Sequence, residues 1–179
     1  VYQSISAKEV YSSYVFPWDC VVLTRSDVVL KMAYIAWMTN DIRLREELCT
    51  YLPALESYNR ASYIGIVLAR TESKVEQEYV LQSLGDRSAD IRDEAYKVLS
   101  EMSLSPEQYQ HIEELLRFKY SEMRINAINL LMKQPEAQLA ASIRRLLSDK
   151  NAERRLAGLD MMKTIRNVDF LKDSYQKLL

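Results

Sequence analysis

Apolar residues recur at helical spacing through most of the chain after Ser73. Ile91, Ala95, Val98 and Met102 follow one another three or four positions apart, which places them on one face of a helix. The pattern predicts helices at 74–84, 90–102, 106–117, 122–133, 136–147, 152–165 and 168–178. Because the connecting loops are short, consecutive helices should pair as antiparallel hairpins.

The part of the chain that precedes Thr71 is less regular. Residues 27–38 are apolar nearly all round, which predicts a buried helix, and 41–51 and 53–70 should form the next two helices. Residues 2–24 show no clear period. We expect there either a short helix with an irregular capping segment or the remnant of a preceding repeat.

Helix-start signals support these boundaries. Ser73 with Glu76, and Ser105 with Gln108, have the spacing of a capping box, in which two side chains satisfy free backbone N–H groups reciprocally. Pro106 follows at the first helical position, where a missing N–H has no cost. Further N-caps are expected at Ser121 and Asn151.

One local pattern occurs three times in the second half of the chain. Leu84, Leu116 and Leu147 begin the three copies at nearly equal spacing. Two further sets keep this spacing: Arg92, Arg124 and Arg155, and Ala95, Ala127 and Gly158. A fixed period of roughly 30 residues is typical of stacked repeat proteins, and the small residues should let paired helices approach closely.

The copies resemble the HEAT repeat, a unit of two antiparallel helices that stacks into a superhelix. They share a first helix ending in Leu, a turn with Asp, and an Arg three positions before a small residue. Asp86 and Asp149 match the turn aspartate of that family, whereas Phe118 departs from it in the middle copy. A shift by one period also places Arg60 under Arg92, in a degenerate earlier copy. The string 152–160 resembles a stretch of large bacterial proteins of the molybdate-metabolism-regulator type.

The resemblance implies an all-α fold, a right-handed HEAT-like (ARM-type) solenoid of about five antiparallel hairpins. We expect a single domain over 1–179. It would comprise an irregular N-terminal helical cap at 1–50, HEAT-like repeats at 52–165 and a C-terminal capping helix at 168–178.

The charged residues of the repeat have two interpretations. Asp86, Arg92, Arg124 and Asp149 should form a ladder of partly exposed ion pairs between adjacent turns, each worth about 0–1 kcal/mol. Alternatively, the arginines with Arg155 are a row of cations that follows a phosphate backbone. We favour the ladder, because two of the three copies carry the matching aspartate.

Composition restricts the class of function. The net charge is −1 and the pI is about 6.0, which is not the strongly basic balance of a nucleic-acid-binding domain. Three scattered glycines cannot build a phosphate-binding loop. Cys20, Cys49 and His111 lack the spacing of a metal-ligand set. We therefore expect no catalytic residue, no cofactor and no metal.

The location of the protein is predicted from what its sequence contains. No apolar run reaches the length of a membrane span, so we expect no membrane partner. Two cysteines in a chain of this length indicate a reducing compartment, which we take to be the cytoplasm. Because the chain begins with Val1, we expect it to be part of a longer protein, and the resemblance to bacterial repeat proteins implies that this protein is bacterial.

Two surfaces are candidates for binding. The second helix of each hairpin should line the concave wall of the solenoid, the usual binding face of such folds. The outward residues expected there are Glu94, Lys97, Glu101, Asn126, Asn129, Lys133, Asp160 and Lys163. A basic patch is formed by Arg144, Arg145, Lys150, Arg154 and Arg155. Because Arg154 and Arg155 lie near a helix N-terminus, which disfavours cations, the patch is either used by an acidic partner or DNA or is a solvated edge.

A repeat without a catalytic constellation predicts a non-catalytic scaffold that binds a protein partner, whose identity the sequence does not give. The alternative is a nucleic-acid-binding domain, by analogy with HEAT-like DNA glycosylases, whose concave surface is basic. Arginines along a continuous positive stripe would favour the alternative, and arginines directed into the turns would not. Nothing in the sequence indicates an oligomeric state.

Overall fold

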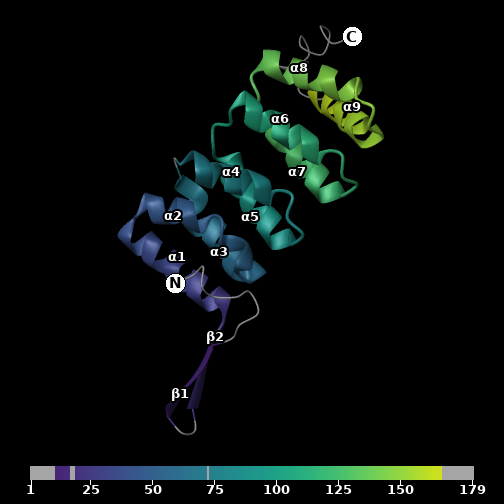
Figure 1. The fold of residues 1–179 in the computed structure, drawn as a ribbon. Coiled ribbons are helices and arrows are strands. Elements are labelled where there is room, and N and C mark those ends of the chain that lie inside the picture. Colours follow the sequence, from purple (N-terminus) through teal and green to yellow (C-terminus); the bar gives the residue numbers. More distant parts are fainter. Residues whose placement is uncertain (1–10, 17–18, 72, 167–179) are drawn as a thin grey trace. The chain divides into compact units, whose positions relative to one another are not determined.

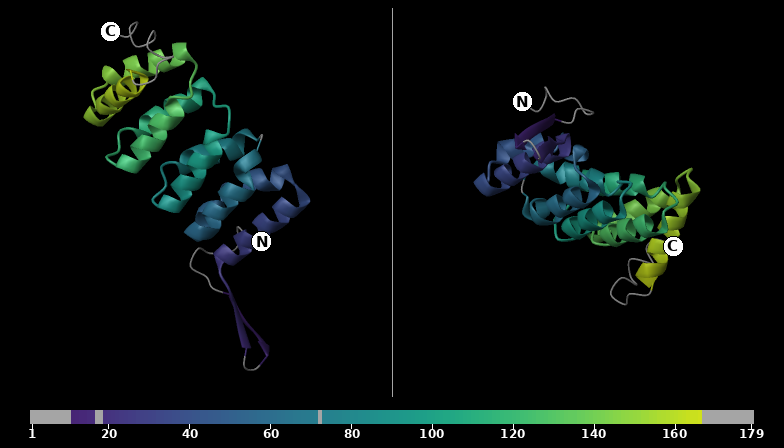
Figure 2. Two further views of the ribbon diagram at one scale, coloured as in Figure 1. Left: turned by 180° about the vertical axis from the view of Figure 1, so that it is seen from behind. Right: turned by 90° about the horizontal axis from the view of Figure 1, so that it is seen from below.

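The computed structural model describes residues 11–16, 19–71 and 73–166, with side chains for 24–71 and 73–165. Within that range the chain forms nine α-helices, two 3₁₀ turns and one β-hairpin (Figures 1 and 2). The chain divides into two compact units, Val1–Val98 and Leu99–Leu179. The helix expected at 168–178 lies outside the described residues.

A β-hairpin opens the first unit. Strands β1 (Tyr11–Phe16) and β2 (Asp19–Leu23) pair antiparallel, with Tyr11 opposite Leu23 and an irregularity between Tyr14 and Phe16. The short helix or irregular segment expected for residues 2–24 is therefore wrong for this part. An apolar run as short as the Val-Val-Leu of β2 shows no periodicity, so the sequence pattern does not distinguish a strand from a helix there.

Helices make up the rest of the first unit. They are α1 (Arg25–Thr39), α2 (Ile42–Leu48), the 3₁₀ turn η2 (Leu52–Ala54), α3 (Ser57–Ile66), the turn η3 (Leu68–Arg70), α4 (Lys74–Ser83) and most of α5 (Ala89–Ser100). The helix expected over 53–70 is shorter than predicted. Leu55 has extended backbone with a ψ of 148°, which ends η2, and α3 begins only at Ser57.

The described part of the second unit contains the end of α5 and four further helices. These are α6 (Pro106–Leu115), α7 (Ser121–Leu131), α8 (Glu136–Leu147) and α9 (Ala152–Arg166). From α4 to α9 every boundary lies within two positions of its prediction. Consecutive helices pack side by side, α6 with α7 and α8 with α9 (Figure 1).

The predicted caps are partly confirmed. Ser105 and Gln108 form the expected capping box, and Asn151 Oδ1 accepts from the backbone N–H of Glu153 at 2.9 Å. Ser121 is not a cap: the N-cap of α7 is Tyr120, which gives no side-chain hydrogen bond.

The capping box expected at Ser73 is only half formed. The Ser73 hydroxyl accepts from the Glu76 N–H, but the Ser73 N–H donates to the Thr71 hydroxyl instead of to Glu76. The Glu76 carboxylate is turned inward and binds Arg45.

The small residues of the repeat lie where the helices come close. Ala95 and Ala127 are buried, as is Gly158. A Cβ atom at Gly158 would lie 3.2 Å from the Leu146 Cβ and from the Leu147 side chain. The absent side chain therefore allows α9 its close contact with α8, as the sequence predicts.

Helix α1 departs from its prediction. The sequence indicates a helix buried nearly all round, but the structure buries only Val29, Ala33 and Ala36. Its other apolar residues include Tyr34 and Met38, which are more than half exposed. The apolar composition of a helix indicates which side chains favour burial. The packing of neighbouring elements determines which of them are buried.

Candidate functional site

The second helices of the first unit form a groove. It lies between α3 and α5 and has a volume of about 360 Å³. Its lining residues are Tyr58, Ala61, Ser62, Asp90, Asp93, Glu94 and Lys97. Two of these, Glu94 and Lys97, belong to the surface predicted from the sequence. The groove thus presents three carboxylates and one ammonium group to solvent.

The two predicted residues form a pair. Lys97 Nζ lies 2.6 Å from Glu94 Oε1, and this hydrogen bond and the charge of Glu94 raise the pKa of Lys97. The end of the Glu94 side chain lies against Gly65 of α3, in the space that a Cβ atom at Gly65 would occupy. Gly65 therefore sets how close the Glu94 carboxylate comes to α3.

Sequence reasoning missed the other polar residues of the groove. Tyr58 is 77% exposed, and Asp90 and Asp93 extend the acidic wall along α5. A signal for them existed: the shift that places Arg60 under Arg92 also aligns α3 with α5 as successive second helices. Side chains facing outward from two such neighbours should line a common groove.

The predicted surface residues of the second unit are not among those that line the groove of the first unit. Asn126 is half-buried, whereas Asn129, Lys163 and Glu101 are exposed. Two of the charges are engaged: Lys133 Nζ donates to the Ser100 carbonyl at 2.5 Å, and Asp160 Oδ2 lies 3.7 Å from Arg124 Nε. The same helices, α7 and α9, expose three apolar side chains that were not predicted: Ile125, Leu156 and Leu159.

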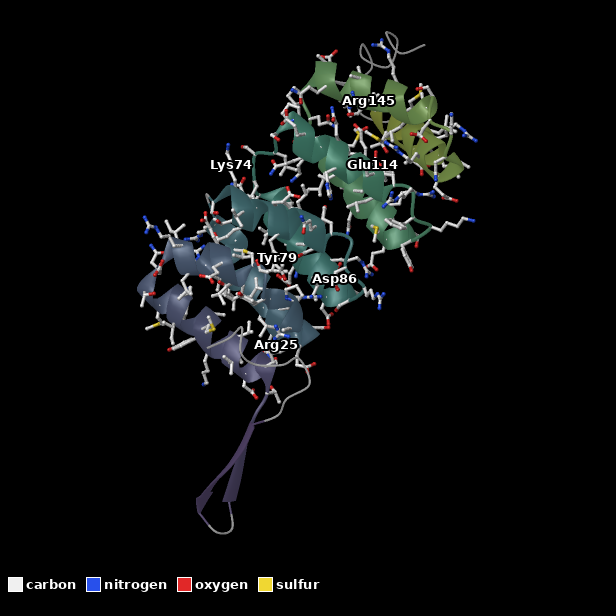
Figure 3. All side chains as sticks on the ribbon, in the orientation of Figure 1. Arg25, Lys74, Tyr79, Asp86, Glu114 and Arg145 are labelled. Atoms are coloured by element: carbon white, nitrogen blue, oxygen red, sulfur yellow. The ribbon has the colours of Figure 1, made fainter. Side chains whose placement is uncertain are left out.

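The charge ladder has different partners from those expected. Asp86 lies in the turn after α4 (Figure 3) and pairs with Arg60 of α3. Arg124 pairs with Glu153 at 3.1 Å rather than with Asp149. Each of these pairs joins the second helix of one hairpin to the next hairpin along the chain.

Two repeat arginines bind main-chain carbonyls of their own turns. Arg92 Nη1 donates to the carbonyls of Asp86 and Arg87, both at 3.0 Å. Arg155 Nη1 donates to those of Asp149 and Lys150, at 2.9 and 2.8 Å. Each guanidinium group thus provides a hydrogen-bond donor for two backbone carbonyls of the turn that precedes its helix.

Much of the basic patch is engaged with acids. Arg145 makes a two-pronged contact with the buried Glu113, with Nη2–Oε1 at 2.7 Å and Nε–Oε2 at 3.2 Å. The hydrogen bond to Glu113 raises the pKa of Arg145. Arg145 of α8 and Glu114 of α6 stand on neighbouring helices (Figure 3).

Arg154 has three acidic neighbours. Its guanidinium lies 2.8 Å from Asp149, 3.3 Å from Glu114 and 3.9 Å from Glu113. The remaining members of the patch, Arg144 and Lys150, are exposed on α8 and in the turn after it.

A buried polar cluster occupies the first unit. Arg45 of α2 binds Glu76 of α4 through Nε–Oε1 at 2.8 Å and Nη2–Oε2 at 2.9 Å, and the Thr71 hydroxyl donates to the same carboxylate. Burial, with the negative charge of Glu76 adding to it, raises the pKa of the Cys49 thiol to about 12. Burial likewise raises the pKa of Tyr63 to about 12. At neutral pH the Cys49 thiol is therefore protonated, and it is a poor nucleophile.

The described residues offer few groups for chemistry. In this part of the chain no three His, Cys, Asp or Glu side chains are arranged to hold a metal ion. A hollow of about 630 Å³ lies at the start of α1, between Thr24–Ser26 and the Thr50–Glu56 segment. The adjoining N-terminus of α1 is already closed by a capping box of Thr24 and Asp27. Among the residues that the structure places, no helix has both the length and the apolar character to cross a bilayer.

Comparisons with known proteins give one match. No curated protein and no solved structure matched the chain, so no named relative supports the resemblance to HEAT repeats or to proteins of the molybdate-metabolism-regulator type. One family matches the chain from residue 1 to residue 179. The chain therefore belongs to the family described as "Family of unknown function (DUF5724)".

Proposed function

We propose that this chain is a non-catalytic scaffold that binds another protein. Its hairpins would continue one another as a HEAT-like solenoid, with the second helices presenting the binding face. The observation that carries the proposal is the groove between α3 and α5, which is lined by residues of two successive second helices. In keeping with its two cysteines, we propose a cytoplasmic location for the protein.

The chemistry of the groove favours a basic segment of the partner. Asp90, Asp93 and Glu94 outnumber the single cation Lys97. A guanidinium group from a partner would form charge-assisted hydrogen bonds with the aspartates. Tyr58, 77% exposed at the same groove, offers an aromatic face for a cation–π contact. An acidic wall repels the phosphates of a nucleic acid.

The geometry of the arginines weighs against the nucleic-acid alternative. Arg92 and Arg155 donate to turn carbonyls, and Arg145 and Arg154 contact carboxylates. A protein that binds DNA through its backbone needs cations that neutralise phosphates and release counterions. We therefore do not propose the alternative, and we use DNA as a competing probe.

A matched pair of variants tests the groove. Asp90→Asn combined with Asp93→Asn removes two charges from the groove. Glu47→Gln combined with Glu78→Gln removes two exposed charges from α2 and α4. The probe is a fluorescein-labelled arginine–serine peptide, followed by fluorescence anisotropy in 0.15 M salt. We expect the groove variant to bind between about twofold and tenfold more weakly than the unsubstituted chain, and the control variant to bind like it.

A photocrosslinking amino acid in place of Tyr58 tests the class of partner. Crosslinked protein recovered from a lysate, reduced by the Asp90 and Asp93 substitutions, supports the proposal. Equal weakening of peptide binding by the two double variants would mean that the peptide responds to the overall charge of the chain and not to the groove. Absence of a protein partner together with tight, salt-sensitive binding of duplex DNA would favour the alternative instead.

A further inference from the structure

Helix α1 carries an apolar face that the described part of its own unit leaves open. Tyr34, Ile35, Trp37 and Met38 are exposed by 56%, 53%, 46% and 62%. Residues three or four positions apart share a side of a helix, so Tyr34 and Ile35 each lie beside Met38. Ile66 of α3, 68% exposed, lines one groove together with Tyr34 and Trp37. We call these five residues the α1 apolar face.

A shallow groove joins the two helices of this face. It lies between α1 and α3, has a volume of about 230 Å³ and is lined almost entirely by apolar groups, among them Tyr34, Trp37 and Ile66. The rings of Tyr34 and Trp37 lie 6.0 Å apart between centroids and tilted by 54°. The aromatic pair therefore forms one wall of this apolar groove.

The size of the α1 apolar face matches half of a dimer interface. A large side chain presents about 200 Å² when fully exposed, so five that are about half exposed present on the order of 500 Å². The largest apolar patch on a typical monomer covers about 300–600 Å² and is often functional. A standard interface buries about 800 Å² on each partner, and homodimer interfaces are about 65% apolar. The apolar area that such an interface requires is therefore also about 500 Å².

The charge pattern favours a second copy of this chain as the occupant. The stretch 32–40, which supplies four of the five side chains of the face, includes no Asp, Glu, Lys or Arg, whereas the exposed Lys31, three and four positions before Tyr34 and Ile35, puts one charge at the edge of the face. A two-fold axis sets each surface against its own copy, so a charge near the axis would meet a like charge. A distinct partner is commonly selected by complementary charges, and this stretch offers none. The net charge of −1 adds little repulsion between two copies.

From this area and the lack of charge over residues 32–40 we infer that two copies of the chain form a symmetric dimer through the α1 apolar face. Helix α1 of one copy packs on α1 of the other, and Ile66 closes the edge of the contact. The inference is separate from the proposed function and does not depend on it. If both hold, the dimer carries two α3–α5 grooves and binds a divalent partner with avidity.

Sedimentation velocity between 1 and 200 µM tests the inference on the whole chain. The unsubstituted protein should shift from monomer to dimer as its concentration rises. Met38→Asp should raise the dissociation constant at least about tenfold, because it places two carboxylates near the axis. Leu159→Asp is the matched control: it puts the same charge on an apolar side chain of α9 that is 53% exposed. A chain that stays monomeric over this range, or equal effects of the two substitutions, overturns the inference.

Crosslinking gives a second measurement that does not rely on the aspartate variant folding. Met38→Cys should be joined to its copy by a short bismaleimide, whereas Leu159→Cys should give no more dimer than the unsubstituted chain. Equal crosslinking at the two positions contradicts the inference. So does a monomeric Met38→Cys chain whose new thiol is protected from maleimide, because that result means the chain covers the face itself.

Discussion

The buried pair of Arg45 and Glu76 should be the most sensitive charged contact of the first unit. The Glu76 side chain is 1% exposed and that of Arg45 is 12% exposed, and two hydrogen bonds of 2.8 and 2.9 Å join them. Glu76→Gln keeps the shape of the side chain but leaves the guanidinium without its counter-ion. Loss of one partner of a buried pair costs about 3–5 kcal/mol. Arg45 keeps its weaker contacts with Asn40 and Val67, so we expect a loss of about 3 kcal/mol.

The pair of Arg124 and Glu153 provides the reference. Its distance is 3.1 Å, similar to the first, but its side chains are 28% and 22% exposed. Glu153→Gln should therefore cost only about 0–1 kcal/mol, because water screens the charges and solvates the partner that remains. Urea unfolding followed by circular dichroism gives the free energy of unfolding of each variant.

Removing both charges of the buried pair separates desolvation from attraction. Arg45→Met combined with Glu76→Leu should recover most of the stability lost in Glu76→Gln, because no unpaired charge stays buried. Two results would refute this reasoning. One is a loss below about 1 kcal/mol in Glu76→Gln, and the other is a double variant as unstable as the sum of its single substitutions.

Two glycines, a buried thiol and the engaged arginines give further tests. Gly65→Ala should be neutral or should stabilise by about 0.5 kcal/mol in urea unfolding, because only the flexible end of Glu94 occupies the new methyl's space. Gly158→Ala should destabilise by about 1 kcal/mol in the same assay. Its new Cβ would lie only 3.2 Å from the Leu146 Cβ and from the Leu147 side chain. An increase in stability of Gly158→Ala would contradict the close contact. Cys49 has a folded pKa of about 12 against an ordinary value of 9.0, so an unfolded chain releases this proton first. Stability should fall as pH rises from about 9 to 12, and Cys49→Ala should lose less over that range, as measured by urea midpoints. Duplex DNA should not bind at low salt in a mobility-shift assay, because the arginines already contact carbonyl and carboxylate groups of the chain. A complex that dissociates on addition of salt would show that these arginines still bind phosphates.

The helices from α4 to α9 were predictable because their signals are local. Ser105 with Gln108 marks the start of α6 within a single turn of sequence, and Gly158 marks a close contact by its spacing from Ala127. The β-hairpin and the exposure of α1 were not predictable in this way. A short apolar run does not reveal its hydrogen-bonding partner, and an apolar helix does not reveal what covers it.

The candidate groove was partly accessible from the sequence. The repeat offset identified Glu94 and Lys97 as outward residues of a second helix. Tyr58 was missed because the earliest copy of the repeat is degenerate, and only the packing of α3 beside α5 brings it to the same groove.

The amino-acid sequence alone determined the helical character, the period of the repeat and the positions where small residues are needed, because each is written in local spacing along the chain. The tertiary structure decided which charges meet. The Asp86 carboxylate pairs with Arg60, and the Glu76 carboxylate binds Arg45 instead of the Ser73 N–H, in each case between elements that are distant in the sequence. The pairing of charged side chains depends on the distance between them and on their burial, and both are set only when the hairpins pack.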